Sequence, residues 1–150
     1  MAAEQGETVD HVIAGKKTKG LGVGGRYISH PYYSEKFREL LGCQPYPGTL
    51  NIETDTDWRQ LAAACIPHVI PEASWQGRGL GAVYAWEATI ETSEGPKRAV
   101  VIRPLLSRHP PNILEIVACE KLADKIEGDR VTARIRCRKN PDYTRPPRLP

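Results

Sequence analysis

Two oxygen-bearing side chains, Thr49 and Asn51, stand one residue apart in the run Pro47-Gly-Thr-Leu-Asn51. Residues two apart on a strand point to the same side, so the Thr49 hydroxyl and the Asn51 amide could share one ligand. Mg²⁺ takes hard oxygen ligands and keeps several waters, so a few protein oxygens suffice to hold it. The pair is therefore a candidate Mg²⁺ site that also grips phosphates. A turn followed by an edge strand is the alternative that either residue alone would favour.

A glycine-rich run, Gly20-Leu-Gly-Val-Gly-Gly25, precedes this pair. Glycines allow successive backbone N–H groups to converge on an anion, and they let a phosphate approach closely. The spacing is neither the dinucleotide-binding Gly-x-Gly-x-x-Gly nor a Walker A motif, which ends in Gly-Lys-Ser/Thr. Lys16, Lys17, Lys19 and Arg26 flank the run, which suits an anion. By itself the run also fits an exposed surface hairpin.

The composition is that of a globular protein with 150 residues, of which 40% are hydrophobic and 26% charged, and a net charge of +3. One domain is expected at this length. No apolar run approaches the roughly 20 residues of a membrane span, and the charge does not require a nucleic-acid partner. We expect a flexible N-terminus (1–8), one domain (9–136) and a basic, proline-rich tail (137–150).

The cysteines are far apart and form no Cys-x-x-Cys pair, which argues against a zinc site. They are Cys43, Cys65, Cys119 and Cys137. The N-terminal residues lack the pattern of a secretory signal. Reduced thiols and a cytoplasmic location are therefore expected.

Short segments with β-branched residues or alternating polarity predict strands. They are 9–14, 50–53, 82–92, 98–103, 113–118 and 130–135, with further extended segments at 26–29 and 66–71 and a hairpin corner at 75–81. Many short strands at close spacing, without a regular βαβ alternation, favour a small β-barrel.

One helix is clearly predicted, beginning at Ser34 and ending at Gly42. Ser34 is a good N-cap residue, Phe37 and Leu41 fall on one helical face, and Gly42 is a typical stop. Residues 57–64 allow a short helix, and 120–125 allow one helical turn.

Taken together, the order of these segments resembles the archaeal-type CTP-dependent riboflavin kinase family. The resemblance lies in Gly20-Leu-Gly-Val-Gly-Gly-Arg-Tyr-Ile-Ser29, then Leu40-Leu-Gly42, then Pro45-Tyr-Pro-Gly-Thr-Leu-Asn51. It continues with Val100-Val-Ile-Arg-Pro104, Ser107-Arg-His109, Ile113-Leu-Glu-Ile-Val-Ala118 and Lys121-Leu122, and so covers about residues 9–135. Its most specific part is the Gly-Thr-Leu-Asn block.

The resemblance implies a mainly β fold, a small six-stranded cradle-loop (RIFT-related) β-barrel with one main helix after the glycine loop. It implies transfer of the γ-phosphate of CTP to the 5′-hydroxyl of riboflavin, giving FMN and CDP, with one Mg²⁺ ion. Thr49 and Asn51 would ligate Mg²⁺, and Ser107 and Glu115 would contact the flavin. The nucleotide-binding residues would be Gly20, Leu21, Gly22, Val23, Gly24, Gly25, Arg26, Glu120, Lys121, Leu122 and Ala123.

Glu115 is the candidate base near the accepting hydroxyl, whereas on a plain strand it would simply be the outward residue between Leu114 and Ile116. Phosphoryl transfer depends chiefly on charge neutralisation and in-line positioning, which backbone amides, Mg²⁺ and these side chains could supply. Some positions depart from the family pattern, namely Arg26, Leu105, Leu106, Ser107 and Cys119.

Two other functions remain open at this point, a non-catalytic flavin- or nucleotide-binding barrel and a DNA-binding regulator of related fold. A Mg²⁺–phosphate clamp would have no use in a DNA-binding protein, so Thr49 and Asn51 favour the kinase over the regulator. The expected partners are riboflavin and CTP, with neither membrane nor nucleic acid, and the expected state is a monomer.

Overall fold

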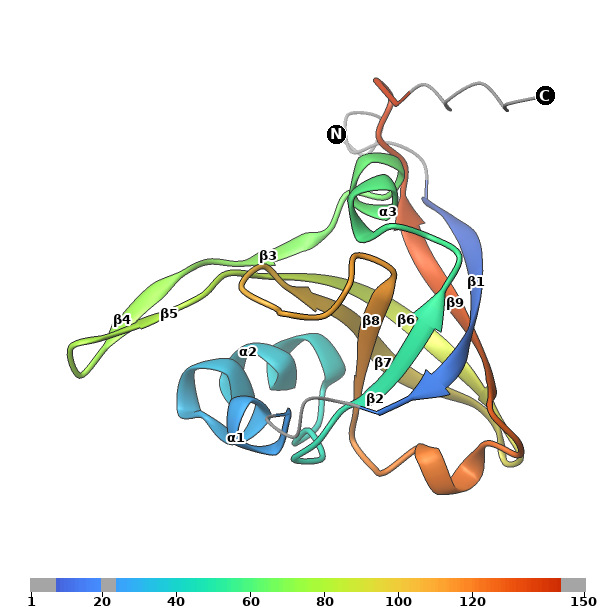
Figure 1. The fold of residues 1–150 in the computed structure, drawn as a ribbon, viewed down its shortest axis with the longest axis horizontal. Helices are drawn as coiled ribbons and strands as arrows, with labels where there is room; N and C mark the ends of the chain where they lie inside the picture. Colours follow the sequence, from blue (N-terminus) through green and yellow to red (C-terminus); the bar gives the residue numbers. More distant parts are fainter. Residues whose placement is uncertain (1–7, 20–23, 144–150) are drawn as a thin grey trace.

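The computed structural model describes residues 8–19 and 24–143 and forms a closed, six-stranded antiparallel β-barrel (Figure 1). Its strands are β1 (Thr8–Thr18), β2 (Leu50–Thr54), β6 (Val83–Thr92), β7 (Gly95–Pro104), β8 (Ile113–Ala118) and β9 (Arg130–Arg138). They follow one another in the order β6-β7-β8-β2-β1-β9, and pairing between β6 and β9 closes the ring. The mainly β barrel predicted from the sequence is confirmed. β9 runs to Arg138, two residues into the segment expected as a tail.

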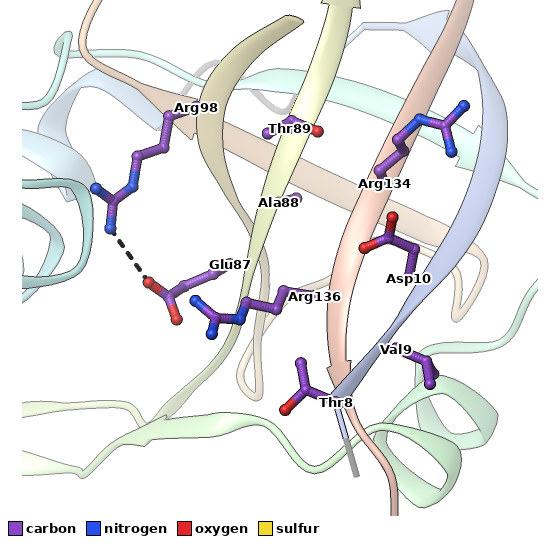
Figure 2. Close-up of a pocket in the computed structure, with 9 residues that line it drawn as sticks. All are labelled: Thr8, Val9, Asp10, Glu87, Ala88, Thr89, Arg98, Arg134 and Arg136. Carbon is purple, nitrogen blue, oxygen red and sulfur yellow. Dashed lines mark hydrogen bonds and ion pairs between the residues drawn. The ribbon is translucent and has the colours of Figure 1, made fainter.

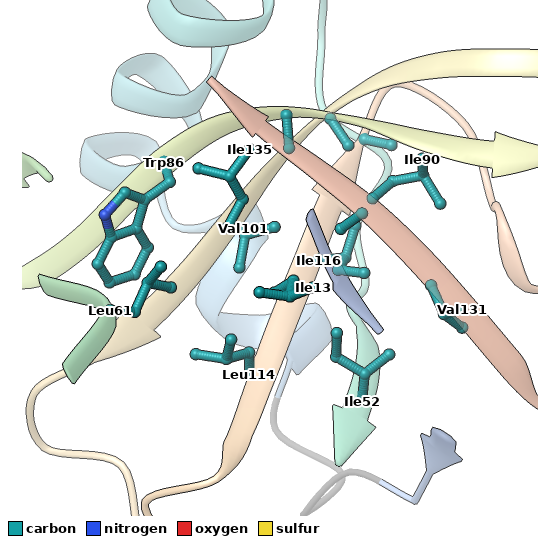
Figure 3. Packing of buried hydrophobic residues seen from close by; sticks show 14 of the residues in the cluster. Ile13, Ile52, Leu61, Trp86, Ile90, Val101, Leu114, Ile116, Val131 and Ile135 are labelled. Atoms are coloured by element: carbon teal, nitrogen blue, oxygen red, sulfur yellow. The ribbon is translucent and has the colours of Figure 1, made fainter. Parts of the chain in front are cut away.

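The barrel interior is filled by aliphatic side chains around one tryptophan (Figure 3). Ile52, Ile90 and Leu114 are fully buried, as is the Trp86 ring at 1% exposure. The Trp86 Nε1–H donates a hydrogen bond of 2.9 Å to the carbonyl of Cys65, so its polar atom is paired inside the core. Close packing of buried side chains makes the barrel a rigid support for side chains on its outer face.

Two consecutive helices, α1 (Gly24–Ser29) and α2 (Pro31–Leu41), lie together beside β2 and β8 (Figure 1). The expected start of α2 at Ser34 is wrong, because His30 caps the helix by accepting from the Tyr32 backbone N–H and Pro31 occupies the first turn. The expected end is confirmed, since Gly42 adopts the left-handed conformation at φ 78°.

The prediction that residues 26–29 are extended is also wrong, because they form most of α1. Ile28 is 1% exposed, and the Tyr27 and Tyr33 ring centroids lie 4.4 Å apart. Packing of this apolar turn against α2 and the barrel outweighs the strand preference of aromatic and β-branched residues.

A second apolar cluster fills the space between this helix pair and the outer face of the barrel. Its members include Ile28, Tyr33, Phe37 and Leu41 from the helices and Val83, Val100, Ile102 and Val117 from the strands. All six residues of β8 are therefore buried, with Leu114 and Ile116 facing the barrel core and Val117 facing the helices. Glu115 has the parity of Val117, so it lies on the helix-covered face.

The remaining elements extend from the barrel. The short helix α3 (Trp58–Ala64) is capped by Asp57, as the sequence allowed, and a 3₁₀ turn, η2 (Ala123–Lys125), follows β8. Strand β3 (His68–Ile70) pairs with β6, and β4 (Ala73–Trp75) and β5 (Arg78–Leu80) form a projecting hairpin (Figure 1). The predicted hairpin corner is confirmed, with Gln76 and Gly77 both at positive φ.

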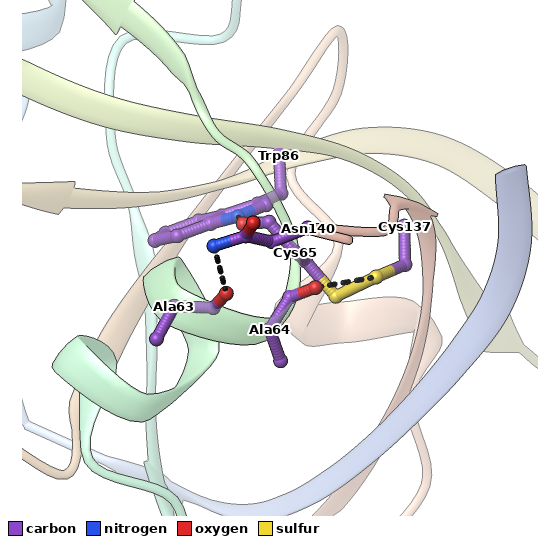
Figure 4. The surroundings of a disulfide bond; sticks show 6 residues. All are labelled: Ala63, Ala64, Cys65, Trp86, Cys137 and Asn140. Carbon is purple, nitrogen blue, oxygen red and sulfur yellow. Dashed lines mark hydrogen bonds between the residues drawn. A yellow bond between two sulfur atoms is a disulfide. The ribbon is translucent and has the colours of Figure 1, made fainter. Parts of the chain in front are cut away.

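The expectation of reduced thiols is wrong, because the four cysteines form the pairs Cys43–Cys119 and Cys65–Cys137. Cys65 and Cys137 are buried beside Trp86 at the end of α3 (Figure 4). Each pair joins residues more than 70 positions apart, which no local spacing rule could reveal. The cytoplasmic location stays a prediction without the support of free thiols.

In the described ranges 8–19 and 24–143, helices are too short or too polar to cross a lipid bilayer.

Candidate active site

A cavity of about 250 Å³ brings together two segments that the sequence marked for a phosphate-binding site. One wall comes from residues 46–50 before and within β2, and the other from the end of β8 and the following turn. The lining residues include Tyr46, Pro47, Gly48, Thr49, Leu50, Glu120, Lys121, Leu122 and Ala123. Thr49 and all four of the expected nucleotide-binding residues after β8 therefore share one hollow.

Beside this cavity, Thr49, Asn51 and Glu115 form a polar cluster on the helix-covered face of the barrel. The Thr49 hydroxyl donates to Asn51 Oδ1 at 3.0 Å, as expected for residues on the same side of a strand. Asn51 lies directly opposite Glu115 in the β2–β8 register, so both side chains project to that face. Asn51 is 5% and Glu115 9% exposed. Three polar side chains are thus held in an otherwise apolar layer.

The two neutral oxygens of this cluster fit a magnesium ion. Neighbouring ligands of an octahedral Mg²⁺ stand about 2.9 Å apart, given metal–oxygen distances of 2.0–2.1 Å. The Thr49 and Asn51 oxygens are 3.0 Å apart, so they are already spaced as two adjacent ligands. Within residues 8–19 and 24–143, no group of three His, Cys, Asp or Glu side chains could hold a metal. An ion here would therefore keep waters or phosphate oxygens for its other ligands.

Glu115 carries a carboxyl group that is almost completely buried. Burial raises the pKa of its carboxyl above the usual range, and the neighbouring Thr49 hydroxyl and the positive charge of Arg103 only partly oppose this. A carboxylate whose pKa is raised in this way is a better proton acceptor than an exposed one. The position that could have been an ordinary outward strand residue is thus a buried carboxyl with a raised pKa.

Lys17, at the end of β1, ties the segment before the glycine run to the turn after β8. Its ammonium donates to the carbonyls of Ala123 at 3.0 Å and Ile126 at 2.7 Å, and its backbone N–H donates to Asp129. Lys17 was expected to attract an anion through its charge. In the structure it instead fixes the turn that carries the cavity wall.

The side chains of Glu120 and Lys121 already have charged partners. Glu120 pairs with Lys125 at 2.5 Å and with Lys97 at 3.9 Å, while Lys121 pairs with Asp124 at 3.7 Å. Glu120 and Lys121 therefore line the cavity from a turn whose charged side chains are already ion-paired.

The glycine run lies mostly outside the described residues. The described residues have a gap between 19 and 24, which contains Gly20, Leu21, Gly22 and Val23. The backbone of Gly24, Gly25 and Arg26 begins α1. The role of the glycine run in nucleotide binding therefore stays a prediction.

Ser107 is not among the residues that line the 250 Å³ cavity. It lies in the loop between β7 and β8, where its hydroxyl accepts from the His109 backbone N–H at 3.1 Å. Glu115 stands in β8 between this loop and the turn that carries Glu120. The predicted flavin contacts, Ser107 and Glu115, thus follow one strand, and the predicted nucleotide contacts continue beyond its end.

Arg103 holds the loop that carries Ser107, and sequence reasoning missed it. Its guanidinium donates to the carbonyls of His109, Pro110 and Ile113 at 2.8–2.9 Å, and the residue is 6% exposed. The only signal in the sequence was an arginine at the end of an apolar strand. Its partners are backbone carbonyls, which every residue has, so the sequence does not identify them.

We expect Arg103→Lys to lower the free energy of unfolding by about 2–4 kcal/mol, because one ammonium cannot replace several charge-assisted hydrogen bonds of a planar guanidinium. Urea unfolding measures the change. The matched control is Arg134→Lys, whose half-exposed pair with Glu91 should contribute less than about 1 kcal/mol. Equal effects of the two substitutions would contradict the role given to Arg103.

The pair Cys43–Cys119 connects the two walls of the cavity. Cys43 lies three residues before Tyr46, and Cys119 lies between Ala118 and Glu120. The Tyr46 backbone N–H also donates to the Ala118 carbonyl at 2.7 Å. The spacing of the walls is therefore fixed by one covalent link and one hydrogen bond.

A larger hollow of about 700 Å³ lies elsewhere, over β1, β6 and β9 (Figure 2). Its arginines are largely paired with carboxylates, Arg98 with Glu87 and Arg134 with Glu91, each at 3.3 Å. It contains none of the predicted site residues. The larger hollow is therefore not the one that the predicted residues line.

Comparisons with known proteins identify a family whose match spans the residues of this cavity and of the polar cluster. The family model CTP-dep_RFKase, described as domain of unknown function DUF120, matches residues 18–135. A protein named riboflavin kinase from Sulfolobus acidocaldarius is 37% identical over 130 residues, which cover 82% of this chain and 80% of the relative. A protein named riboflavin kinase from Sulfurisphaera tokodaii is 35% identical over 130 residues, which cover 82% of this chain and 93% of the relative. A longer one from Pyrococcus abyssi is 38% identical over 128 residues, and the match covers 58% of its length.

Proposed function

The chain belongs to the CTP-dependent riboflavin kinase family, and on that premise we propose that it transfers the γ-phosphate of CTP to the 5′-hydroxyl of riboflavin, giving FMN and CDP. The observation that carries the proposal is the Thr49–Asn51–Glu115 cluster beside the cavity, in which Asn51 and Glu115 are buried, within the matched residues. A barrel that only bound a ligand would have no evident need for a desolvated carboxylate next to two metal-type oxygens.

In this proposal Thr49 and Asn51 hold one Mg²⁺, which when bound neutralises phosphate charge during transfer. Glu115 accepts the proton of the attacking hydroxyl or orients it by a hydrogen bond. The walls at residues 46–50 and 120–123 position the nucleotide, and Ser107 contacts the flavin. Positioning and electrostatics account for most of the catalysis, as in other phosphoryl transfers.

The deciding experiment incubates the protein with riboflavin, Mg²⁺ and each of the four nucleoside triphosphates, and FMN is quantified by chromatography. We expect FMN with CTP at a rate at least about tenfold above that with the other donors. Absence of FMN with every donor would sink the kinase proposal in favour of a non-catalytic barrel. FMN with another triphosphate would keep the kinase and correct the donor. A monomeric state and a cytoplasmic location stay predictions.

Breaking the covalent link between the cavity walls should weaken nucleotide binding. We expect Cys43→Ala to lower the free energy of unfolding by about 2–4 kcal/mol and to raise the Kd for CTP, because the two walls lose their cross-link. Calorimetric titration and thermal unfolding measure the two effects.

The matched control is Cys65→Ala, which opens the buried pair at the end of α3, away from the cavity. It should lower stability and leave the Kd for CTP unchanged at a temperature where the variant is folded. An unchanged Kd in Cys43→Ala would show that the link does not shape the site.

A further inference from the structure

A buried tyrosine hydroxyl in the layer between the helices and the barrel lacks a hydrogen-bond partner among the described residues. Tyr27, in α1, packs its ring against Tyr33 and Phe37, with centroid distances of 4.4 and 6.2 Å. The hydroxyl oxygen is shielded from solvent and has no hydrogen-bond partner among the described residues. A buried hydroxyl without a partner costs free energy, so such groups in folded proteins usually mark a site that something else completes.

Glu115 lies on the face of the barrel that Tyr27 covers, because Tyr27 packs against the cluster that contains Val117 and Glu115 has the parity of Val117 in β8. Burial, then the neighbouring Tyr33, then the charge of Glu115 raise the pKa of the Tyr27 phenol, so it stays a protonated donor. The phenol and the Glu115 carboxylate are nevertheless not joined by a hydrogen bond, since the Tyr27 oxygen has none. A donor and an acceptor therefore face the same layer between the helices and the barrel without a hydrogen bond between them.

The chemistry of this pair selects its ligand. A phosphate oxygen would accept from the phenol, but it would be repelled by a neighbouring carboxylate. An alcohol can accept a hydrogen bond from one group and donate one to another, so it satisfies both at once. A chain of alcohol groups is the chemistry that fits between Tyr27 and Glu115.

We propose that Tyr27 belongs to the acceptor site, where its hydroxyl donates to an alcohol of the substrate's polyol chain and that alcohol donates to Glu115. This inference rests on the proposed function, in which the acceptor is riboflavin and the polyol is its ribityl chain. Tyr27 is then a binding residue that holds the chain against the carboxylate.

The test compares Tyr27→Phe with Tyr33→Phe. Tyr33 is a matched control because its ring lies in the same cluster, whereas its hydroxyl already donates to the Gly81 carbonyl at 2.6 Å. Flavin fluorescence quenching measures the Kd for riboflavin and for lumiflavin, which has the same ring system without the ribityl chain. Thermal unfolding of the ligand-free proteins gives a third readout.

We expect Tyr27→Phe to raise the riboflavin Kd about tenfold, to leave the lumiflavin Kd and the KM for CTP unchanged, and to leave the Tm of the free protein equal or higher. Tyr33→Phe should lower the Tm and leave the riboflavin Kd unchanged. A residue that only packed would not separate the two flavins.

Two outcomes overturn the inference in distinguishable ways. If the wild-type protein makes FMN and Tyr27→Phe binds riboflavin as tightly as the wild type, the inference fails and the kinase stands. If the wild-type protein neither binds riboflavin nor makes FMN, the proposed function fails, and the assignment of Tyr27 falls with it.

Discussion

Thr49→Ala is expected to lower the rate of FMN formation by about 100-fold or more while the barrel stays folded. Substitutions in the outer shell of metal sites already cost 10–100-fold, and loss of a direct ligand should cost at least as much. The Thr49 hydroxyl is one of two oxygens that stand 3.0 Å apart, at the spacing of adjacent Mg²⁺ ligands. Initial rates measured over a range of Mg²⁺ concentrations should show that far more metal is needed for the residual activity.

Asn51→Ala should behave in the same way, since it removes the other oxygen of the pair. Thr49→Ser keeps the hydroxyl and should retain most of the activity. Thr54→Val is a control on the same strand, because the Thr54 hydroxyl is engaged with backbone carbonyls of Thr56 and Asn112. It should affect stability without changing the Mg²⁺ requirement. Wild-type rates in both alanine variants at every Mg²⁺ concentration would reject the metal assignment.

Glu115→Gln is expected to lower FMN formation by about 10²–10⁴-fold, the usual contribution of a positioned acid–base group. Glutamine preserves the size of the side chain and one acceptor oxygen, but its amide cannot take up a proton as a carboxylate does. The Kd for riboflavin should change much less than turnover. Single-turnover kinetics with saturating CTP separate the two effects.

The same substitution should stabilise the metal-free protein at neutral pH. Because burial raises the pKa of Glu115, the folded state binds this proton more tightly than the unfolded state. The stability that protonation contributes is present at low pH and is lost as the pH rises through the raised pKa. Glutamine carries no charge and escapes that loss. The gain in unfolding free energy should therefore be largest at neutral pH and vanish below the ordinary glutamate range.

Urea unfolding in the presence of a chelator, from pH 3 to pH 8, measures this gain. Full turnover in Glu115→Gln, or an unfolding free energy that differs from the wild type by the same amount at every pH, would contradict the role of a buried, reactive carboxylate. The combination of a more stable protein and a slower enzyme is what a functional buried charge predicts.

Much of the fold could be predicted because its signals are local. Alternating and β-branched residues marked β6 and β8, and the glycine after Leu41 marked the end of α2. The predicted start of α2 at Ser34 was wrong because His30 caps the helix and Pro31 is its first residue. The turn at residues 24–29 was misassigned because its conformation depends on the surfaces it packs against, α2 and the barrel.

The candidate site likewise has features that could be predicted from local sequence and features that could not. The side shared by Thr49 and Asn51 follows from the two-residue period of a strand, and the structure agrees. Whether Glu115 faces solvent or a protein layer could not follow from β8 alone, since either face of a strand can be covered. Helix packing against that face buries it, and the burial changes its pKa.

The sequence by itself determined the strands, the family resemblance and the metal-type pair, because strand periods, turn residues and short motifs are encoded within a few positions. Only the tertiary structure decided which cysteines meet and that Arg103 holds the loop of Ser107. It also decided that the Tyr27 hydroxyl is buried with no hydrogen-bond partner among residues 8–19 and 24–143. These features arise where segments far apart in the chain come into contact. Their energies depend on burial and on the partners that closure of the barrel brings together, and no stretch of sequence contains that information alone.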